Sequence, residues 1–166
     1  MILKYAHGDL LDMMDEGRVN YVLHCCNCQA IMGSGIALQI KNRYPAVHDA
    51  YLNYHNLMGL ELGTVSYAKA GEVSSLVRRY VFNLHAQNLF GSGDRFVDYE
   101  ALYKSMERAR HIIVSNIGGV GTVGVPYNMA AFRAGGDFRI VEVMLEVIFE
   151  KTNLDVMIVK YNGKNV

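Results

Sequence analysis

Hydrophobic and polar positions follow two periodicities along the chain. Short segments that are continuously apolar, or that alternate apolar with polar residues, are typical of β-strands. Such segments occupy residues 2–6, 20–25, 64–70, 79–86, 120–127 and 156–161. Apolar residues that recur every three or four positions predict helices over residues 10–16, 36–44, 47–58, 99–113 and 138–149. Strands that alternate with helices predict one α/β domain, residues 1–166, around a mostly parallel sheet.

Boundary residues support several of these elements. Asp9 and Asp98 precede predicted helices and are suitable N-caps. Pro45 disfavours a helical conformation at Tyr44, which predicts the end of the second helix there. Residues 89–97 are rich in glycine and polar residues and predict a loop.

Composition restricts the class of protein. The 166 residues are 51% hydrophobic and 19% charged, which is typical of a globular domain with a buried core. Sixteen basic and sixteen acidic residues balance, so no overall field attracts nucleic acid or an anionic membrane. No apolar run approaches the roughly 20 residues that span a bilayer. The N-terminus lacks the regions of a signal peptide, so we expect a cytoplasmic protein.

The three cysteines, Cys25, Cys26 and Cys28, lie within four positions. Their odd number and close spacing argue against a disulfide framework. Together with His24 they suggest a zinc site, but the spacing is too compressed for one tetrahedral ion. We therefore expect reduced thiols that pack at a strand end, with no zinc, no other metal and no cofactor.

The segment from residue 24 to residue 37 carries the clearest functional signal. An apolar strand leads into a polar elbow, and Gly33-Ser34-Gly35 then opens onto a helix that begins near Ile36. Such a turn points unpaired N–H groups at one place, which suits a phosphate or diphosphate. Glycine allows the backbone to approach the ligand closely. The spacing matches neither the Walker motif nor the six-residue dinucleotide fingerprint.

This segment and several others resemble the macrodomain family, in particular the small ADP-ribose 1″-phosphate phosphatases and relatives that remove ADP-ribose from glutamate. The resemblance implies a three-layer α/β/α fold with a mixed, mostly parallel six-stranded sheet. The matching motifs are His24-Cys25, Asn27-Cys28, residues 32–37, residues 7–11, residues 37–45, residues 98–102 and residues 135–138.

The resemblance implies a role for particular residues. Asp9 would accept a hydrogen bond from the adenine amine, although it is also a helix cap, and the two roles are compatible. Asn27 would hold the distal ribose; the alternative is a turn residue. The residues expected to bind substrate are Gly8, Asp9, Leu10, Asn27, Met32, Gly33, Ser34, Gly35, Ile36, Asn128, Met129, Ala130, Ala131 and Phe132.

Two residues are candidates for catalysis. Asp137 lies in the Gly-Gly-Asp-Phe segment, where hydrolytic relatives carry an acidic residue, and it could activate water or bind a ribose hydroxyl. A simple N-cap explains it equally well. His24 occupies the place of a histidine in the phosphatase-like loop and could assist proton transfer. The alternative for His24 is a buried ring whose nitrogens are satisfied.

The sequence departs from the family at two places. The second phosphate loop of the family is rich in glycine, whereas this chain has Asn128, Ala130 and Phe132 at those positions. Relatives that act on glutamate use a lysine nucleophile, and Gln87 stands about where that lysine would be. An amide cannot form the covalent adduct that an amine forms, which argues against the lysine mechanism.

The resulting hypothesis is an enzyme that hydrolyses ADP-ribose 1″-phosphate to ADP-ribose and phosphate. One alternative is an ADP-ribose reader without turnover. Another is a lysine-independent hydrolase that removes ADP-ribose from a protein or nucleic acid. The expected ligand is in each case ADP-ribose, its 1″-phosphate or an ADP-ribosylated macromolecule, with no membrane partner.

Overall fold

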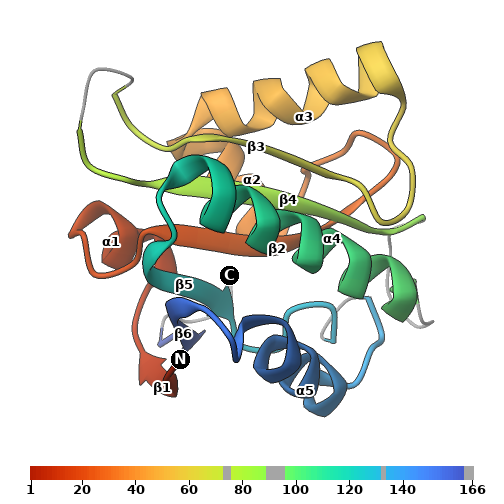
Figure 1. Cartoon of the computed structure of the whole chain (residues 1–166). Helices are drawn as coiled ribbons and strands as arrows, with labels where there is room; N and C mark the ends of the chain where they lie inside the picture. Colours follow the sequence, from red (N-terminus) through yellow and green to blue (C-terminus); the bar gives the residue numbers. More distant parts are fainter. Residues whose placement is uncertain (73–75, 89–95, 132–133, 163–166) are drawn as a thin grey trace.

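A computed structural model describes residues 1–72, 76–88, 96–131 and 134–162 (Figure 1). Its strands are β1 (Leu3–His7), β2 (Tyr21–Asn27), β3 (Val65–Lys69), β4 (Tyr80–Gln87), β5 (Val120–Pro126) and β6 (Asn153–Lys160). Its helices are α1 (Leu10–Asp15), α2 (Gly35–Arg43), α3 (Pro45–Met58), α4 (Tyr99–Ile112), the short π-helix η1 (Ile113–Ile117) and α5 (Phe138–Phe149). Most of the loop predicted at 89–97, including Gly91, and also Phe132 lie outside the described residues.

The six strands form one sheet in the order β1-β6-β5-β2-β4-β3. Among the named strands of the described residues, β3 and β4 pair antiparallel and the other neighbouring pairs are parallel. The predicted α/β class and the mixed, mostly parallel six-stranded sheet are therefore confirmed. Several boundaries differ from the sequence prediction by one to three residues; for example, β2 continues to Asn27, and β6 begins at Asn153.

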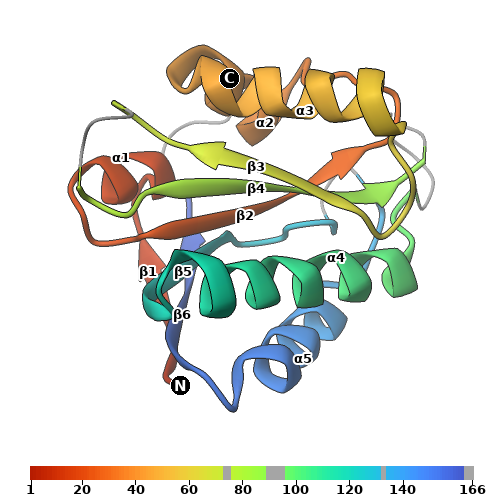
Figure 2. The same cartoon turned by 45° about the horizontal axis from the view of Figure 1, so that its top comes forward.

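Helices cover both faces of the sheet (Figure 2). On one face α1, α2 and α3 pack through buried residues that include Leu11, Ile40 and Val47. On the other face α4 and α5 pack through residues that include Met106 and Leu145. This arrangement gives the expected three layers. No helix in the described part of the chain is both long and apolar enough to cross a bilayer.

The apolar stripe predicted for residues 47–58 is only partly buried. Val47 and Tyr51 are fully buried in α3, whereas Met58 is 70% exposed. Met58 is the last residue of the helix, and Gly59 then turns the chain with a φ of +75°. The last turn of α3 therefore does not join the core.

Glycine in β5 permits close packing of α1 on the sheet. A Cβ at Gly124 would lie 2.6 Å from Leu10 Cδ1 and 2.7 Å from a methyl group of Val19. Gly124 weakens the strand pattern in the sequence, but here it allows close packing. The contact fixes the start of α1, and with it Asp9, at the end of β1.

Candidate functional site

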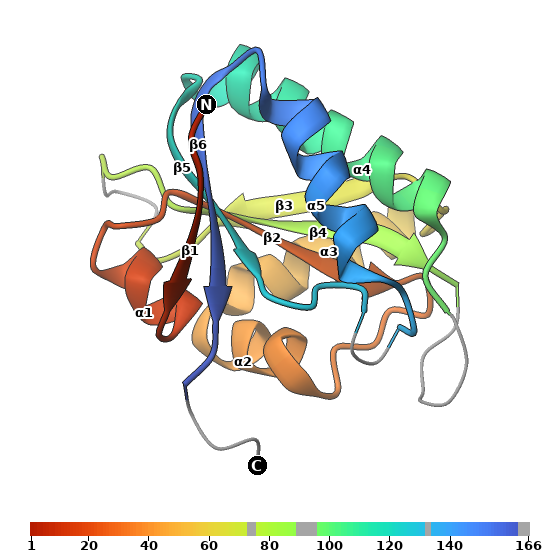
Figure 3. The ribbon, with the colours of Figure 1, turned by 90° about the horizontal axis from the view of Figure 1, so that it is seen from below.

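Five parallel strands end at the same edge of the sheet (Figure 3). Ligands of open α/β sheets bind beyond this edge. The segments that follow β1, β2 and β5 contain nearly all the residues that the sequence predicts to bind substrate.

Asp9 caps α1 through one carboxylate oxygen. Its Oδ1 accepts hydrogen bonds from the backbone N–H groups of Leu11 and Asp12, at 2.9 and 3.0 Å. Its Oδ2 has no protein partner among the described residues. Gly8 precedes it with a φ of +150°, and a Cβ there would lie 2.6 Å from Met13 Cε. Asp9 is therefore a cap that keeps one acceptor oxygen for a ligand.

Asn27 organises the loop that follows β2. Its Oδ1 accepts from the N–H of Gln29 at 2.9 Å, and its Nδ2 donates to the carbonyl of Ile31 at 2.8 Å. The Tyr51 hydroxyl lies 2.5 Å from the Asn27 carbonyl oxygen and 3.0 Å from Oδ1. Met32 is buried beside Tyr51. The structure thus shows the turn-forming role of Asn27, and the described residues supply no acceptor for the second N–H of its amide.

The start of α2 presents unpaired backbone donors. Ser34 is the N-cap, but its side chain makes no capping hydrogen bond. The first backbone bond at this end runs from the N–H of Leu38 to the carbonyl of Ser34, at 3.3 Å. Gly33, Ser34 and Gly35 are exposed, and Gly35 has a φ of +57°. The N–H groups of Gly35, Ile36 and Ala37 are consequently available for an anion.

The turn after β5 has left-handed backbone conformations that are typical of glycine, although the residues there are not glycine. Asn128 has a φ of +63° and Ala130 a φ of +62°. These are two of the positions at which the family loop carries glycine. Asparagine adopts this left-handed conformation readily, whereas alanine does so at a cost of roughly 1–2 kcal/mol. Met129 and Ala130 are buried, so their packing holds the turn in place.

We expect Ala130→Gly to raise the free energy of unfolding by about 0.5–1 kcal/mol. Glycine removes the strain at a positive φ, which outweighs the larger entropy of the unfolded chain. Urea denaturation measures the change. Ala131→Gly is the matched control, because Ala131 has no positive φ, and it should lower stability instead. Equal effects of the two variants would contradict the assignment of strain to Ala130.

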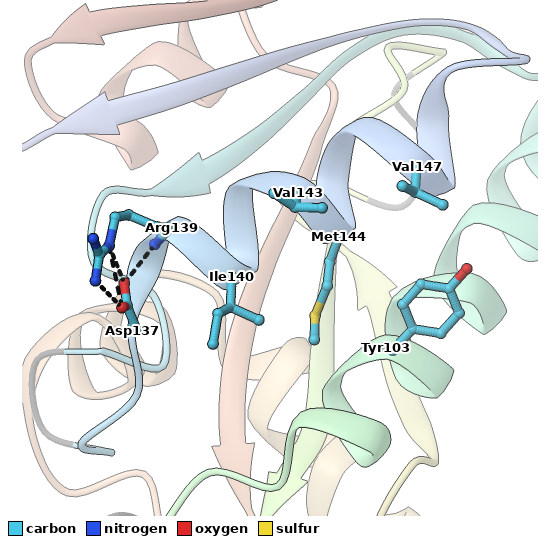
Figure 4. A pocket seen from close by; sticks show the side chains of 7 residues that line it. All are labelled: Tyr103, Asp137, Arg139, Ile140, Val143, Met144 and Val147. Carbon is cyan, nitrogen blue, oxygen red and sulfur yellow. Dashed lines mark hydrogen bonds and ion pairs between the residues drawn. The ribbon is translucent and has the colours of Figure 1, made fainter.

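Asp137 caps α5 and binds Arg139 (Figure 4). Its Oδ1 accepts from the backbone N–H of Arg139 at 3.0 Å. Arg139 Nη2 donates to Oδ2 at 2.6 Å, and Nε lies 3.1 and 3.2 Å from the two carboxylate oxygens. The side-chain hydrogen bonds from Arg139, followed by its backbone N–H, lower the pKa of the Asp137 carboxyl. The carboxylate is ionised near neutral pH and half-exposed.

His24 lies in the core under α3 and has no exposed surface. Its Nε2 lies 2.6 Å from Asn83 Oδ1, and Asn83 Nδ2 donates to Ser66 Oγ at 3.1 Å. Ser66 Oγ lies 2.9 Å from His85 Nε2, and His85 Nδ1 lies 2.8 Å from Thr64 Oγ1. We call these five side chains the buried polar chain. Of the two interpretations of His24, the structure shows the satisfied buried ring.

The structure does not bring His24 and Asp137 together. Asn83, the partner of His24, donates to the backbone carbonyl of Val47 in α3. Asp137 begins α5, which covers the other face of the sheet (Figure 2). An acid–base pair of these two residues is therefore not assembled.

A hollow of about 720 Å³ lies beside Asp137 and Arg139. Its other lining residues are Tyr5, Tyr127, Asn128, Ala131, Gly136, Phe138 and Glu142. A second hollow of about 520 Å³ lies between α4 and α5 and shares Asp137 and Arg139 (Figure 4). Neither hollow is lined by residues 33–36. Sequence reasoning missed Arg139; its spacing of two residues from a capping aspartate was the available signal.

Solved structures with a similar fold include two macrodomains. The macrodomain of Thermus aquaticus DarG has a TM-score of 0.75 and 19% identity, over 95% of this chain and 97% of that one. The macrodomain of Mycobacterium tuberculosis DarG has a TM-score of 0.74 and 24% identity, over the same shares. This chain has the macrodomain fold. The family resemblance seen in the sequence is thereby confirmed, whereas the scan against family models finds no match.

Proteins similar to this chain in sequence include some of named activity. It is 24% identical over 150 residues to an ADP-ribose 1″-phosphate phosphatase of Scheffersomyces stipitis, covering 81% of this chain and 86% of that protein. It is 48% identical over 50 residues to a DNA ADP-ribosyl glycohydrolase of Mycobacterium tuberculosis, covering 30% and 13%. An uncharacterised protein of phage T4 is 34% identical over 110 residues, and the match spans 64% of each chain.

The cysteines of the macrodomain are free thiols. Burial raises the pKa of Cys25 to about 12 and also raises that of Cys26 well above its ordinary value. Such thiols are protonated and poorly reactive. No group of three or more His, Cys, Asp or Glu side chains within the described ranges could hold a metal ion.

Proposed function

We propose that this macrodomain binds ADP-ribose and hydrolyses ADP-ribose 1″-phosphate to ADP-ribose and phosphate. The observation that carries the proposal is the exposed, uncapped start of α2, which follows a strand next to the left-handed turn at Asn128 and Ala130. Together they offer backbone donors to a diphosphate. The similarity to the yeast phosphatase extends over 81% of the chain and supports this substrate.

In the proposed complex the N–H groups of Gly35, Ile36 and Ala37 bind the diphosphate. The free Oδ2 of Asp9 accepts a hydrogen bond from the adenine amine. The unused N–H of Asn27 donates to a hydroxyl of the distal ribose, while its other contacts hold the loop in place.

Asp137 is the proposed catalytic base. Its carboxylate is ionised and lines the hollow next to the turn after β5, so it can orient a water molecule and accept its proton. The water oxygen attacks phosphorus, the bond from phosphorus to the 1″ oxygen breaks, and that oxygen is protonated from solvent. His24 has no role in this step, because its ring is shielded from any substrate.

A second candidate is removal of ADP-ribose from DNA. The 48% identity to the mycobacterial glycohydrolase over 50 residues favours it. The zero net charge favours a small substrate, because nucleic-acid binding depends on phosphate neutralisation by basic residues. The free thiols agree with the cytoplasmic location that we propose for either activity.

Product analysis tests the proposal. Purified protein is incubated with ADP-ribose 1″-phosphate, with an ADP-ribosylated DNA oligonucleotide and with an ADP-ribosylated protein. Release of phosphate from the first substrate alone supports the phosphatase. Release of ADP-ribose from the oligonucleotide supports the second candidate and contradicts the first. Binding of ADP-ribose without turnover of any substrate would contradict both and identify a reader.

We expect Ser34→Asp to weaken ADP-ribose binding by at least about tenfold and to stabilise the protein by about 1 kcal/mol. A carboxylate at this position would cap the N–H groups that the native serine leaves unpaired, and it would repel the diphosphate. Isothermal titration calorimetry and thermal denaturation measure the two effects.

Ser34→Ala is the matched control for this variant. The native hydroxyl makes no capping bond, so its loss should leave both affinity and stability nearly unchanged. Full ADP-ribose affinity in the aspartate variant would place the diphosphate elsewhere.

A further inference from the structure

The guanidinium group of Arg139 has one edge that the protein does not use. Nε and Nη2 form the edge that holds the carboxylate of Asp137. Nη1 and the outer N–H of Nη2 form the second edge, for which the described residues supply no acceptor. The side chain is 87% exposed. Planar donor pairs of this kind match the oxygens of a phosphate group in a bidentate manner.

Arg139 lines a hollow that contains further hydrogen-bond donors. Arg139, the side-chain amide of Asn128 and Tyr127 all line the volume of about 720 Å³. The Tyr127 ring packs edge-on against Phe138, with ring centroids 5.1 Å apart, which holds it at the wall. Glu142 is a further charged residue of the lining and opposes the binding of an anion.

The hollow is continuous with the turn after β5. Gly136 donates its N–H to the carbonyl of Ala130 at 2.9 Å. A Cβ at Gly136 would lie 2.5 Å from that same oxygen, so only glycine allows this contact. The 128–131 turn and the start of α5 are thus joined at the backbone. The turn that we propose to face the diphosphate therefore leads directly into the hollow that Asp137 and Arg139 line.

We propose that Arg139 recognises the phosphate group on the 1″ position of the substrate and makes this site specific for a phosphomonoester. The inference rests on the proposed function and deepens it. One edge of the guanidinium keeps Asp137 in place while the other binds the phosphate. A single cation between the two anionic groups lowers their mutual repulsion and holds the base beside the phosphorus atom.

The test compares two ligands that differ only in the 1″-phosphate. Arg139→Gln should raise the KM for ADP-ribose 1″-phosphate by roughly 10–100-fold, because a hydrogen bond to a charged group is lost. The dissociation constant for ADP-ribose should stay within about twofold of the native value, and inorganic phosphate should no longer inhibit. Arg139→Lys should restore part of the loss, because the ammonium keeps the charge without the planar fork.

Glu142→Gln is the companion variant, and it should strengthen inhibition by inorganic phosphate severalfold. An equal loss of affinity for ADP-ribose 1″-phosphate and for ADP-ribose in Arg139→Gln would overturn the inference. No loss of affinity for either ligand would overturn it as well. Calorimetry with the 1″-phosphate replaces KM if the native protein shows no turnover. Tighter binding of the 1″-phosphate than of ADP-ribose, dependent on Arg139, would then support the phosphate site although hydrolysis had failed. Turnover with an unchanged KM in Arg139→Gln would refute the phosphate site at Arg139. The proposed phosphatase activity would still stand.

Discussion

Replacement of Asp137 by asparagine is expected to slow phosphate release from ADP-ribose 1″-phosphate by about 100-fold or more, the usual contribution of a general base. Asparagine remains a good N-cap, so α5 should stay intact and ADP-ribose should still bind. Arg139 holds the pKa of this carboxyl below its usual range, so the base stays ionised in mildly acidic solution. The rate of the native protein should therefore show no acidic decline near the ordinary pKa of aspartate.

Asp98→Asn is the matched control for the loss of turnover. Asp98 caps α4 as Asp137 caps α5, accepting a hydrogen bond from the N–H of Ala101 at 2.8 Å, and it lines neither hollow. Phosphate release should be nearly unchanged in this variant. A loss of turnover shared by both variants would indicate a general effect of capping, and an active Asp137→Asn protein would rule out the catalytic base.

Acid is expected to begin to destabilise this protein near pH 6.5, above the range in which its carboxylates are protonated. Burial lowers the pKa of His24 and of His85 from 6.5 to about 4, and the neighbouring His24 contributes to the shift of His85. The unfolded chain then binds protons that the folded chain does not. Each histidine costs about 3 kcal/mol of stability as the pH falls from about 6.5 to about 4. Urea denaturation between pH 7.5 and 4 measures the loss.

Burial keeps His24 neutral, and the hydrogen bonds of the buried polar chain add a second reason for the neutrality of His85. Thr64 donates to the carbonyl of Glu61 at 2.6 Å, so its oxygen accepts from Nδ1 of His85. His85 Nε2 then accepts from the hydroxyl of Ser66, which itself accepts from Asn83. A second proton on His85 would meet a donor in place of an acceptor.

Controls separate these two rings from other groups. His24→Gln should remove about half of the acid-induced loss, while the exposed His111→Gln should change nothing. Proton NMR of the native protein should show two histidine rings that remain neutral at pH 5.5. A free energy of unfolding that is constant between pH 7 and pH 5 would contradict the assignment.

The sequence predicted the order and type of the elements well, because periodicity and capping are local properties. The caps at Asp9, Asp98 and Asp137 were predicted and are confirmed. Strand ends were less accurate, since they depend on partners. Asn27 belongs to β2 because a shift in the pairing with β4 brings it opposite Gln87, and nothing in the local sequence indicates that.

The sequence predicted candidate site residues only where a short motif determines the local backbone conformation by itself. The glycines at 33 and 35 and the cap at Asp9 are of this kind. The sequence could not show that His24 points under α3, because a strand residue alternates between two faces whose covering helices lie far along the chain. Nor could it show that Asn128 and Ala130 hold the backbone that glycine provides elsewhere, since the turn is held by the burial of Met129 and Ala130.

The place of β1 in the sheet sets an order on folding during synthesis. This strand pairs only with β6, in a register that joins Leu3 to Val156 and His7 to Lys160. β1 is synthesised before the other described strands, so it meets its neighbour only after residue 160 has emerged. Until then β1 lacks its partner strand, although β2, β3 and β4 can already associate. Nascent chains arrested before β6 should thus contain an unpaired β1, and the ADP-ribose binding that we propose should arise abruptly once β6 is complete.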